Sequence, residues 1–199
     1  MAVSKHRIEA LTDGIFAVAM TLLVIELKVP DPASIHVPAD VARAVAHLIP
    51  MFISWIISFF VLGIFWNSQH RLFHYVRVAD GTLAWLTIGY LAFVSLMPFS
   101  SALAGLYGTV LFSQVFYSAN MILLAIFSLL MTRYVFRHPE LQGTTLAAPS
   151  YRAVRFRVVG LMVIALVAIG ITALLPGAGN AAFMLMMPIS IISRRIDRG

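Results

Sequence analysis

The sequence predicts an all-α integral membrane protein with six transmembrane helices per subunit and both termini in the cytoplasm. Of its 199 residues, 61% are hydrophobic and only 11% are charged, and the mean hydropathy is +0.94. Soluble domains are about 45–50% apolar and about 25% charged, so this composition indicates a chain that crosses a bilayer several times. The polar links between the hydrophobic runs are short, which predicts a single membrane domain over residues 1–199.

Three of the six hydrophobic runs end at or near prolines. The first run ends before Pro30 and Pro32, the third near Pro98, and the fifth at Pro176, because proline lacks the N–H that a helix interior requires. The second run has about 27 residues. Since about 20 residues cross a bilayer, it predicts a tilted or extended helix. The sixth run is short and contains Pro188. The predicted spans are residues 7–28, 43–69, 81–99, 109–134, 158–175 and 181–193.

Basic residues fall almost entirely on one side of these spans. With the N-terminus in the cytoplasm, only Lys28 and Arg43 lie on the opposite side. Short cytoplasmic loops carry an excess of Lys and Arg, so the pattern predicts a multi-pass protein of the cell membrane with an even number of spans. Five spans would place Arg194, Arg195 and Arg198 outside, which favours the short sixth span. The basic residues on the cytoplasmic side are Lys5, Arg7, Arg71, Arg77, Arg133, Arg137, Arg152, Arg155, Arg157, Arg194, Arg195 and Arg198.

Several classes of function lack the residues that they need. There is no cysteine, so neither disulfides nor thiolate metal sites can form. The pI of 10.2 arises from basic residues in short links rather than in a polar domain, which argues against nucleic acid as a partner. His70 and His74 have the spacing of metal ligands but stand in a basic setting with no adjacent glutamate. No metal site, no cofactor and no catalytic set of residues is predicted, so the chain is not expected to be an enzyme.

The first span carries one stripe of apolar side chains and a hydroxyl. At 100° per residue, Val18, Thr21 and Ile25 lie within about 60° of one another, with Leu22 beside them. One interpretation is that this stripe faces lipid or the protein core. The other is that it lines a path through the membrane.

Asp13 interrupts the same hydrophobic run. A carboxylate on a spanning helix costs roughly 2.5–3.5 kcal/mol on insertion scales, so it is expected to face a bundle interior or water. Asp13 lies about 140° from Val18, on a side that a neighbouring helix is predicted to cover. A hydrogen-bonded structural role and a proton relay are both open for it. In the fourth span, Asn120 is predicted to bond to another helix.

Three sequence blocks resemble a known family. The first is Arg7 followed by Leu11-Thr12-Asp13, with Gly-Ile-Phe-Ala-Val-Ala-Met-Thr after it. The second is Phe65-Trp66-Asn67-Ser68-Gln69-His70-Arg71-Leu72-Phe73, and the third is Asp80-Gly81-x-Leu83-x-Trp85-Leu86 followed by Leu96-Met97-Pro98-Phe99. Over residues 4–105 the chain resembles the transmembrane protein 175 family, which comprises a lysosomal potassium channel and its bacterial relatives.

The resemblance implies a homotetramer in which the first helix of each subunit lines a central pore. It implies passive, weakly discriminating conduction of potassium through a constriction on that helix, without a carbonyl-loop filter. Other monovalent cations or protons are alternative permeant ions, and a proton-conducting channel or a small secondary transporter are alternative functions. Carried over by position, the pore-lining residues are Val18, Thr21, Leu22 and Ile25. The residues of a structural polar network are Arg7, Thr12, Asp13, Trp66 and His70.

Some positions depart from the family pattern. Leu11 replaces a phenylalanine and removes an aromatic packing surface, whereas Thr12 replaces a serine and keeps the hydroxyl. Gln69 stands where the family has a histidine, and it cannot carry a charge. The implied fold is unaffected by these changes, but a titrating role at that position is not expected here.

Overall fold

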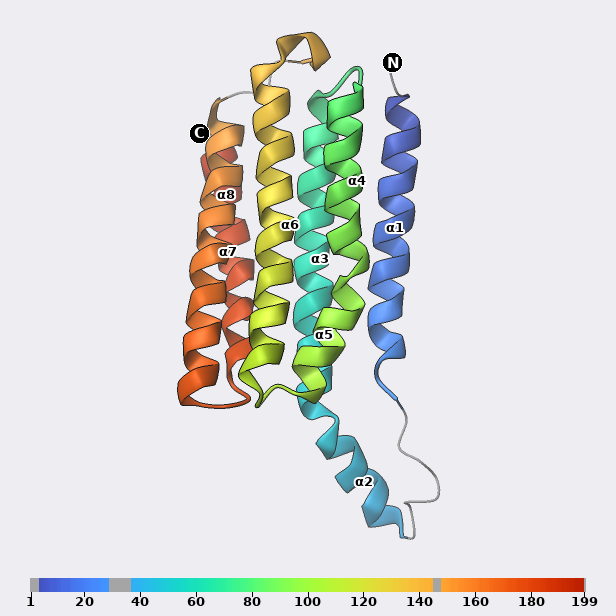
Figure 1. Ribbon diagram of the computed structural model, residues 1–199, viewed down its shortest axis with the longest axis vertical. Coiled ribbons are helices and arrows are strands. Elements are labelled where there is room, and N and C mark those ends of the chain that lie inside the picture. Colours follow the sequence, from blue (N-terminus) through green and yellow to red (C-terminus); the bar gives the residue numbers. More distant parts are fainter. Residues whose placement is uncertain (1–3, 29–36, 145–147, 199) are drawn as a thin grey trace.

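The computed structural model describes residues 4–28, 37–144 and 148–198, and it is a bundle of roughly parallel and antiparallel helices (Figure 1). Five stretches of the described chain are long and apolar enough to cross a membrane: Lys5–Ile25, Ile49–Tyr75, Gly81–Leu106, Leu111–Arg137 and Ser150–Leu174. They contain α1 (Lys5–Ile25), α3 (Ile49–Tyr75), α4 (Gly81–Ser95), α5 (Met97–Leu106), α6 (Leu111–Arg137) and α7 (Ala148–Leu174). The prediction of an all-α chain with several spans is confirmed.

The second predicted span, residues 43–69, is two helices rather than one. A short helix α2 (Pro38–His47) projects from the end of the bundle (Figure 1), and the chain bends at Leu48 before α3. Pro50 explains the break, because it has no N–H for the carbonyl of Ala46 and its ring would collide with that carbonyl. In the first turn of α3 the missing N–H has no consequence. The bounding prolines Pro30 and Pro32 of the first span lie outside the described residues.

The predicted end of the third span near Pro98 is wrong for the same reason. The helix breaks at Leu96, and Pro98 then stands in the first turn of α5, which continues to Leu106. Proline therefore separates two helical pieces of one membrane-crossing stretch. The fifth span begins at Ala148 rather than at residue 158, because the Arg-containing segment before the apolar run is already helical.

The sixth predicted span, residues 181–193, is divided between a 3-10 helix η3 (Gly179–Leu185) and α8 (Met186–Arg198). The apolar part, Gly179–Ser193, is shorter than a full membrane crossing. These two elements run back along α7, so that α8 ends at the same end of the bundle at which α1 begins (Figure 1). The sixth crossing and the cytoplasmic position of the termini remain predictions.

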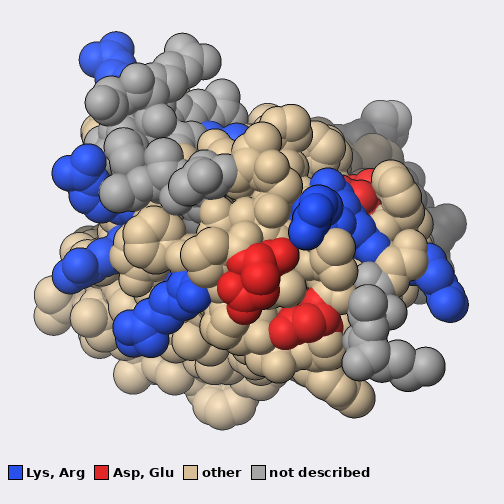
Figure 2. Space-filling view, turned by 90° about the horizontal axis from the view of Figure 1, so that it is seen from above, with Lys and Arg blue, Asp and Glu red and all other residues tan. Residues whose placement is uncertain are grey.

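Charge is distributed unequally between the two ends of the bundle. The helix ends that contain Arg71, Arg133 and Arg137 lie together with the start of α1, whereas Lys28 and Arg43 lie toward the other end. Viewed from the first of these ends, several Lys and Arg side chains surround a smaller acidic area (Figure 2). This arrangement is the one expected from the charge pattern of the sequence.

Hydroxyl and amide side chains link the helices inside the bundle. The Ser58 hydroxyl on α3 donates to Ser101 Oγ on α5 at 2.8 Å and lies 2.9 Å from the Tyr117 hydroxyl on α6. Asn120 Nδ2 donates to Ser100 Oγ at 3.0 Å, which confirms the interhelical bond predicted for Asn120. Since lipid offers no partners for buried polar groups, these bonds satisfy them within the protein. Such bonds average roughly 0.6 kcal/mol each in a membrane protein.

Asp80 begins α4 and ties it to α6. Its carboxylate accepts from the Leu83 backbone N–H at 2.8 Å as an N-cap, and from the Tyr134 hydroxyl at 2.5 Å. Burial acts to raise the pKa of Asp80, but the hydrogen bonds from Tyr134 and Leu83 and the nearby His138 outweigh it. They hold the pKa below its ordinary value of 3.8.

We predict that Asp80→Asn lowers the free energy of unfolding by about 1–2 kcal/mol at neutral pH, because a cap and a charge-assisted hydrogen bond are both weakened. A carboxylate with a lowered pKa stabilises the fold above its ordinary pKa, and this contribution is lost as the pH falls through the lowered value. The midpoint of thermal unfolding in detergent should therefore differ between wild type and variant at pH 7, and the difference should begin to shrink only as the pH falls below about 4. Equal midpoints at pH 7 would contradict the capping role. In the Asp80→Asn background, Tyr134→Phe should cost little more, since its acceptor has already lost its charge.

Candidate functional site

One side of α1 packs into the bundle, and the other is left uncovered. The buried side carries Ile8, Thr12, Phe16, Ala19 and Leu23, which face α3, α4 and α5. The uncovered side carries the four positions predicted to line a pore. In the single chain, Val18 is 56% exposed, Leu22 is 41% exposed and Ile25 is 65% exposed, and Thr21 is exposed with them.

Thr21 presents an oxygen on this uncovered side. Its hydroxyl donates to the backbone carbonyls of Ala17 and Val18, at 3.0 and 2.8 Å. Because the hydroxyl hydrogen is directed back to the helix, the lone pairs of Oγ1 are left to accept. A hydroxyl held in this way can replace a water molecule around a cation.

A shallow apolar cavity of about 370 Å³ runs along α1 beside these residues. Its wall includes Leu11, Gly14, Val18 and Leu22 of α1, and Ser95 at the end of α4. Nothing lies within 4 Å of the position that a side chain at Gly14 would occupy. A long exposed apolar surface of this kind on a membrane helix is covered by lipid or by another protein surface.

Asp13 lies on the exposed part of α1, and not in the buried contact with a neighbouring helix that the sequence predicted. The buried side of α1 is centred near Thr12 and Phe16, and the step of about 100° from Thr12 carries Asp13 to its margin. From there its carboxylate accepts a hydrogen bond from Trp66 Nε1 at 2.8 Å. The ring of His70 stacks on Trp66, with centroids 5.8 Å apart and planes 24° from parallel.

The structure brings together only part of the predicted polar network. Asp13, Trp66 and His70 are in contact through the bond and stacking described above, and they line one cavity of about 240 Å³ together with Glu9 and Thr12. Arg7, on the exposed part of α1, makes no ion pair with Asp13 among the described residues.

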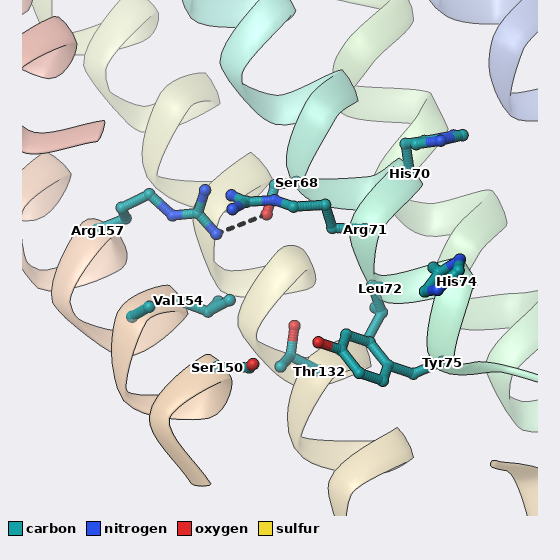
Figure 3. Close-up of a pocket in the computed structure, with 11 residues that line it drawn as sticks. Ser68, His70, Arg71, Leu72, His74, Tyr75, Thr132, Ser150, Val154 and Arg157 are labelled. Atoms are coloured by element: carbon teal, nitrogen blue, oxygen red, sulfur yellow. Dashed lines mark hydrogen bonds between the residues drawn. The ribbon is translucent and has the colours of Figure 1, made fainter. Parts of the chain in front are cut away.

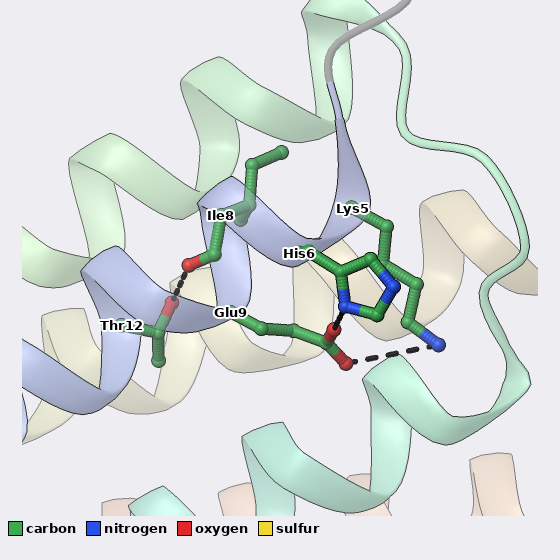
Figure 4. A network of polar contacts seen from close by, with 5 residues as sticks. All are labelled: Lys5, His6, Ile8, Glu9 and Thr12. Atoms are coloured by element: carbon green, nitrogen blue, oxygen red, sulfur yellow. Dashed lines mark hydrogen bonds and ion pairs between the residues drawn. The ribbon is translucent and has the colours of Figure 1, made fainter.

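The remaining polar groups at the start of α1 bond within the helix itself. The Thr12 hydroxyl is buried and donates to the carbonyl of Ile8 at 2.8 Å (Figure 4). Glu9 pairs with Lys5 at 3.7 Å and lies 3.6 Å from His6 Nδ1 (Figure 4). Thr12 therefore contributes to packing rather than to a bond with Asp13. Within the described part of the chain, no group of three or more His, Asp or Glu side chains is placed to hold a metal ion.

Sequence reasoning did not single out Arg157. Its side chain is only 6% exposed on α7, and its guanidinium donates to Ser68 Oγ of α3 at 2.8 Å. The sequence offered one signal, because Arg157 directly precedes a long apolar run. In the structure, Ala153 and Val158 on the same helix are also buried.

Known proteins match this chain most often over about half of its length. A family model described as the endosomal/lysosomal potassium channel TMEM175 matches residues 7–98. A potassium channel of Streptomyces collinus is 30% identical over 76% of this chain and 74% of its own length. A potassium channel of a Chryseobacterium species is 35% identical, with 51% of this chain and 50% of that protein aligned. The mouse protein named endosomal/lysosomal proton channel TMEM175 is 36% identical, with 48% of this chain and only 20% of its own length aligned.

The fold agrees with these matches. The crystal structure of a lysosomal potassium-selective channel TMEM175 homolog from Chamaesiphon minutus superposes with a TM-score of 0.77 and 24% identity, over 95% of this chain and 97% of that one. At that identity the superposition supports the fold alone. The Streptomyces match covers most of both chains, and the family model covers α1 to α4, so this chain belongs to the TMEM175 family.

Proposed function

We propose that this chain is a subunit of a potassium channel in which copies of α1 surround a central pore. The observation that carries the proposal is the uncovered side of α1. The four positions that family resemblance assigns to the pore share the side of α1 that the described residues of a single subunit leave exposed. Relatives aligned over half or more of this chain are named potassium channels, and membership of a channel family argues against an enzyme.

A homotetramer with six crossings per subunit and cytoplasmic termini is the assembly we propose. Four copies would place rings of Val18 and Ile25 around the axis, with a ring of Thr21 hydroxyls between them. The apolar cavity beside Leu11 and Leu22 would be covered by the neighbouring copy. Closing these surfaces removes exposed apolar area from lipid contact and gives each α1 a protein neighbour on both flanks.

Such a pore selects by constriction rather than by a cage of carbonyls. The sequence has no Thr-Val-Gly-Tyr-Gly-like segment. Apolar rings hinder ions by excluding water, and hydroxyl oxygens restore part of the hydration shell of a cation between them. Because side chains are less rigid than a carbonyl ring, we propose that discrimination between potassium and sodium is weak.

Proton conduction is the second candidate. Its support is the name of the animal relatives, together with the cavity in which Glu9, Asp13 and His70 meet. These side chains can exchange protons, whereas the α1 stripe carries no titratable group.

A potassium channel, a coupled potassium–proton exchanger and a proton channel can be distinguished in proteoliposomes that are loaded with potassium and diluted into a large impermeant cation such as N-methylglucamine. A fluorescent dye inside the vesicles reports the internal pH. For a potassium channel, we expect passive potassium efflux to make the lumen negative. Protons are then drawn in, and the lumen acidifies, only after a protonophore provides a path for them. Acidification without protonophore would indicate coupled potassium–proton exchange. If acidification requires valinomycin instead, protons are the permeant ion.

We predict that Thr21→Val lowers potassium flux about fivefold, since an oxygen contact of about 1 kcal/mol is removed without a change of shape. Val18→Ala and Ile25→Ala should raise conductance and reduce the preference for potassium over sodium, because each widens an apolar ring. Single-channel recording in planar bilayers, with potassium exchanged for sodium, measures both effects.

Val24→Ala is the matched control for Val18→Ala. Val24 is 48% exposed on the same helix, but it lies about 120° from Val18 around the axis. Its truncation should change flux less than twofold. If Thr21→Val and Val18→Ala leave flux and selectivity unchanged in assembled protein, α1 does not line the path.

We further propose that Asp13 is an anchor for Trp66 rather than an ion ligand. Trp66→Phe keeps a ring near His70 but removes the N–H, so it should destabilise the subunit by about 1 kcal/mol. This is less than the roughly 1.5–3 kcal/mol of a hydrogen bond to a charged group, because Asp13 is exposed and solvent screens it. Asp13→Ala should lower the stability of the subunit by a similar free energy. The loss is measured as a lower midpoint of thermal unfolding or as a smaller tetramer peak in size-exclusion chromatography. In the doubly substituted chain the two losses should not add. A fully assembled Asp13→Ala channel with altered ion preference would refute the anchor.

A further inference from the structure

A second polar cavity, of about 290 Å³, lies between α3, α6 and α7 at the basic end of the bundle (Figure 3). It is separate from the uncovered side of α1. We propose that this cavity binds a phosphate group, either on a lipid headgroup or as the free anion. The proposal does not depend on which ion the channel conducts.

Two arginines from different helices enter the cavity. Arg157 extends from α7 and Arg71 from α3, and their guanidinium groups point toward one another (Figure 3). Two positive charges on either side of one space attract an anion into it.

The position of Arg157 is fixed before any ligand arrives. It is 6% exposed and donates to Ser68 Oγ at 2.8 Å. This bond helps to hold the planar guanidinium group in place. Ser68 accepts in that bond, so that its own hydroxyl hydrogen can donate to an oxygen in the cavity. The site is therefore organised in advance, which lowers the entropic cost of binding.

The donors favour phosphate over other anions. Guanidinium groups match the paired oxygens of a phosphate through two parallel hydrogen bonds, and several arginines around one site are typical of phosphate recognition. Ser150 on α7 and Tyr75 on α3 add hydroxyl groups to the wall. None of the described residues that line the cavity is Asp or Glu, so no carboxylate in the wall repels the ligand.

The surroundings suit a lipid headgroup in particular. The cavity lies where α3 ends and where the apolar stretch Ser150–Leu174 begins, which is the level of the headgroups if these helices span the bilayer. Leu72, Ala153 and Val154 provide an apolar part of the wall beside the arginines. Basic pockets between transmembrane helices are sites at which anionic headgroups bind.

The experiment measures thermal unfolding of the full chain in uncharged detergent at constant ionic strength. The probes are inorganic phosphate and dihexanoyl phosphatidic acid, with chloride and dihexanoyl phosphatidylcholine as controls. We expect a saturable rise of the unfolding midpoint with phosphatidic acid, and a rise with phosphate if the free anion also enters. A rise with phosphatidic acid alone assigns the site to a lipid headgroup.

Arg71→Gln should weaken the apparent affinity at least tenfold. Arg157→Lys tests the second arginine without removing its buried charge, and it should weaken binding because lysine cannot form the paired bonds. Arg133→Gln is the matched control: it removes a charge from the same end of the bundle, but Arg133 is exposed on α6 and does not line the cavity. Its affinity should stay within twofold of wild type. The proposal is overturned if neither phosphatidic acid nor phosphate gives a saturable shift. It is also overturned if Arg71→Gln and Arg133→Gln weaken binding equally.

Discussion

The rotation of α1 about its own axis is the constraint on which the candidate site depends. Phe16 sets it: the side chain is 1% exposed, and its ring lies 5.9 Å from that of Tyr90, which in turn packs 6.4 Å from Phe65. These three rings join α1, α4 and α3 in one cluster. With Phe16 held there, Thr21 can only face outward, because residues five apart on a helix point in nearly opposite directions.

The sequence predicted the membrane-crossing stretches well and their internal breaks poorly. Hydropathy identifies a span because it depends on composition alone, and the stretches of α1, α3, α6 and α7 all lie where apolar runs stand in the sequence. Proline gave ambiguous signals. Pro50 and Pro98 both stand in the first turns of helices, where proline is as acceptable as it is after a helix end, and sequence alone does not distinguish the two positions.

The site was predicted in part, for reasons that differ between residues. The stripe of Val18, Thr21 and Ile25 follows from helical geometry, so its members do share one side of α1. Whether a neighbouring helix covers Asp13 depends on how helices distant in sequence are packed, and periodicity carries no information about that. Arg157 was counted as a residue of a link because a positive charge is usual there. Its burial becomes visible only when α7 is placed beside Ser68 of α3.

The helices differ in how closely they are connected to α1. It packs mainly against α3, α4 and α5, whereas α7 packs against α6 and α8, and α8 packs mainly against α7. The segment that matches the family model, residues 7–98, is thus the part that holds α1 in place. A substitution in α7 or α8 is therefore felt by α1 mainly through the helices between them. The cavity between α3 and α7 can thus be altered from its α7 wall without a change in the residues that hold α1 in place.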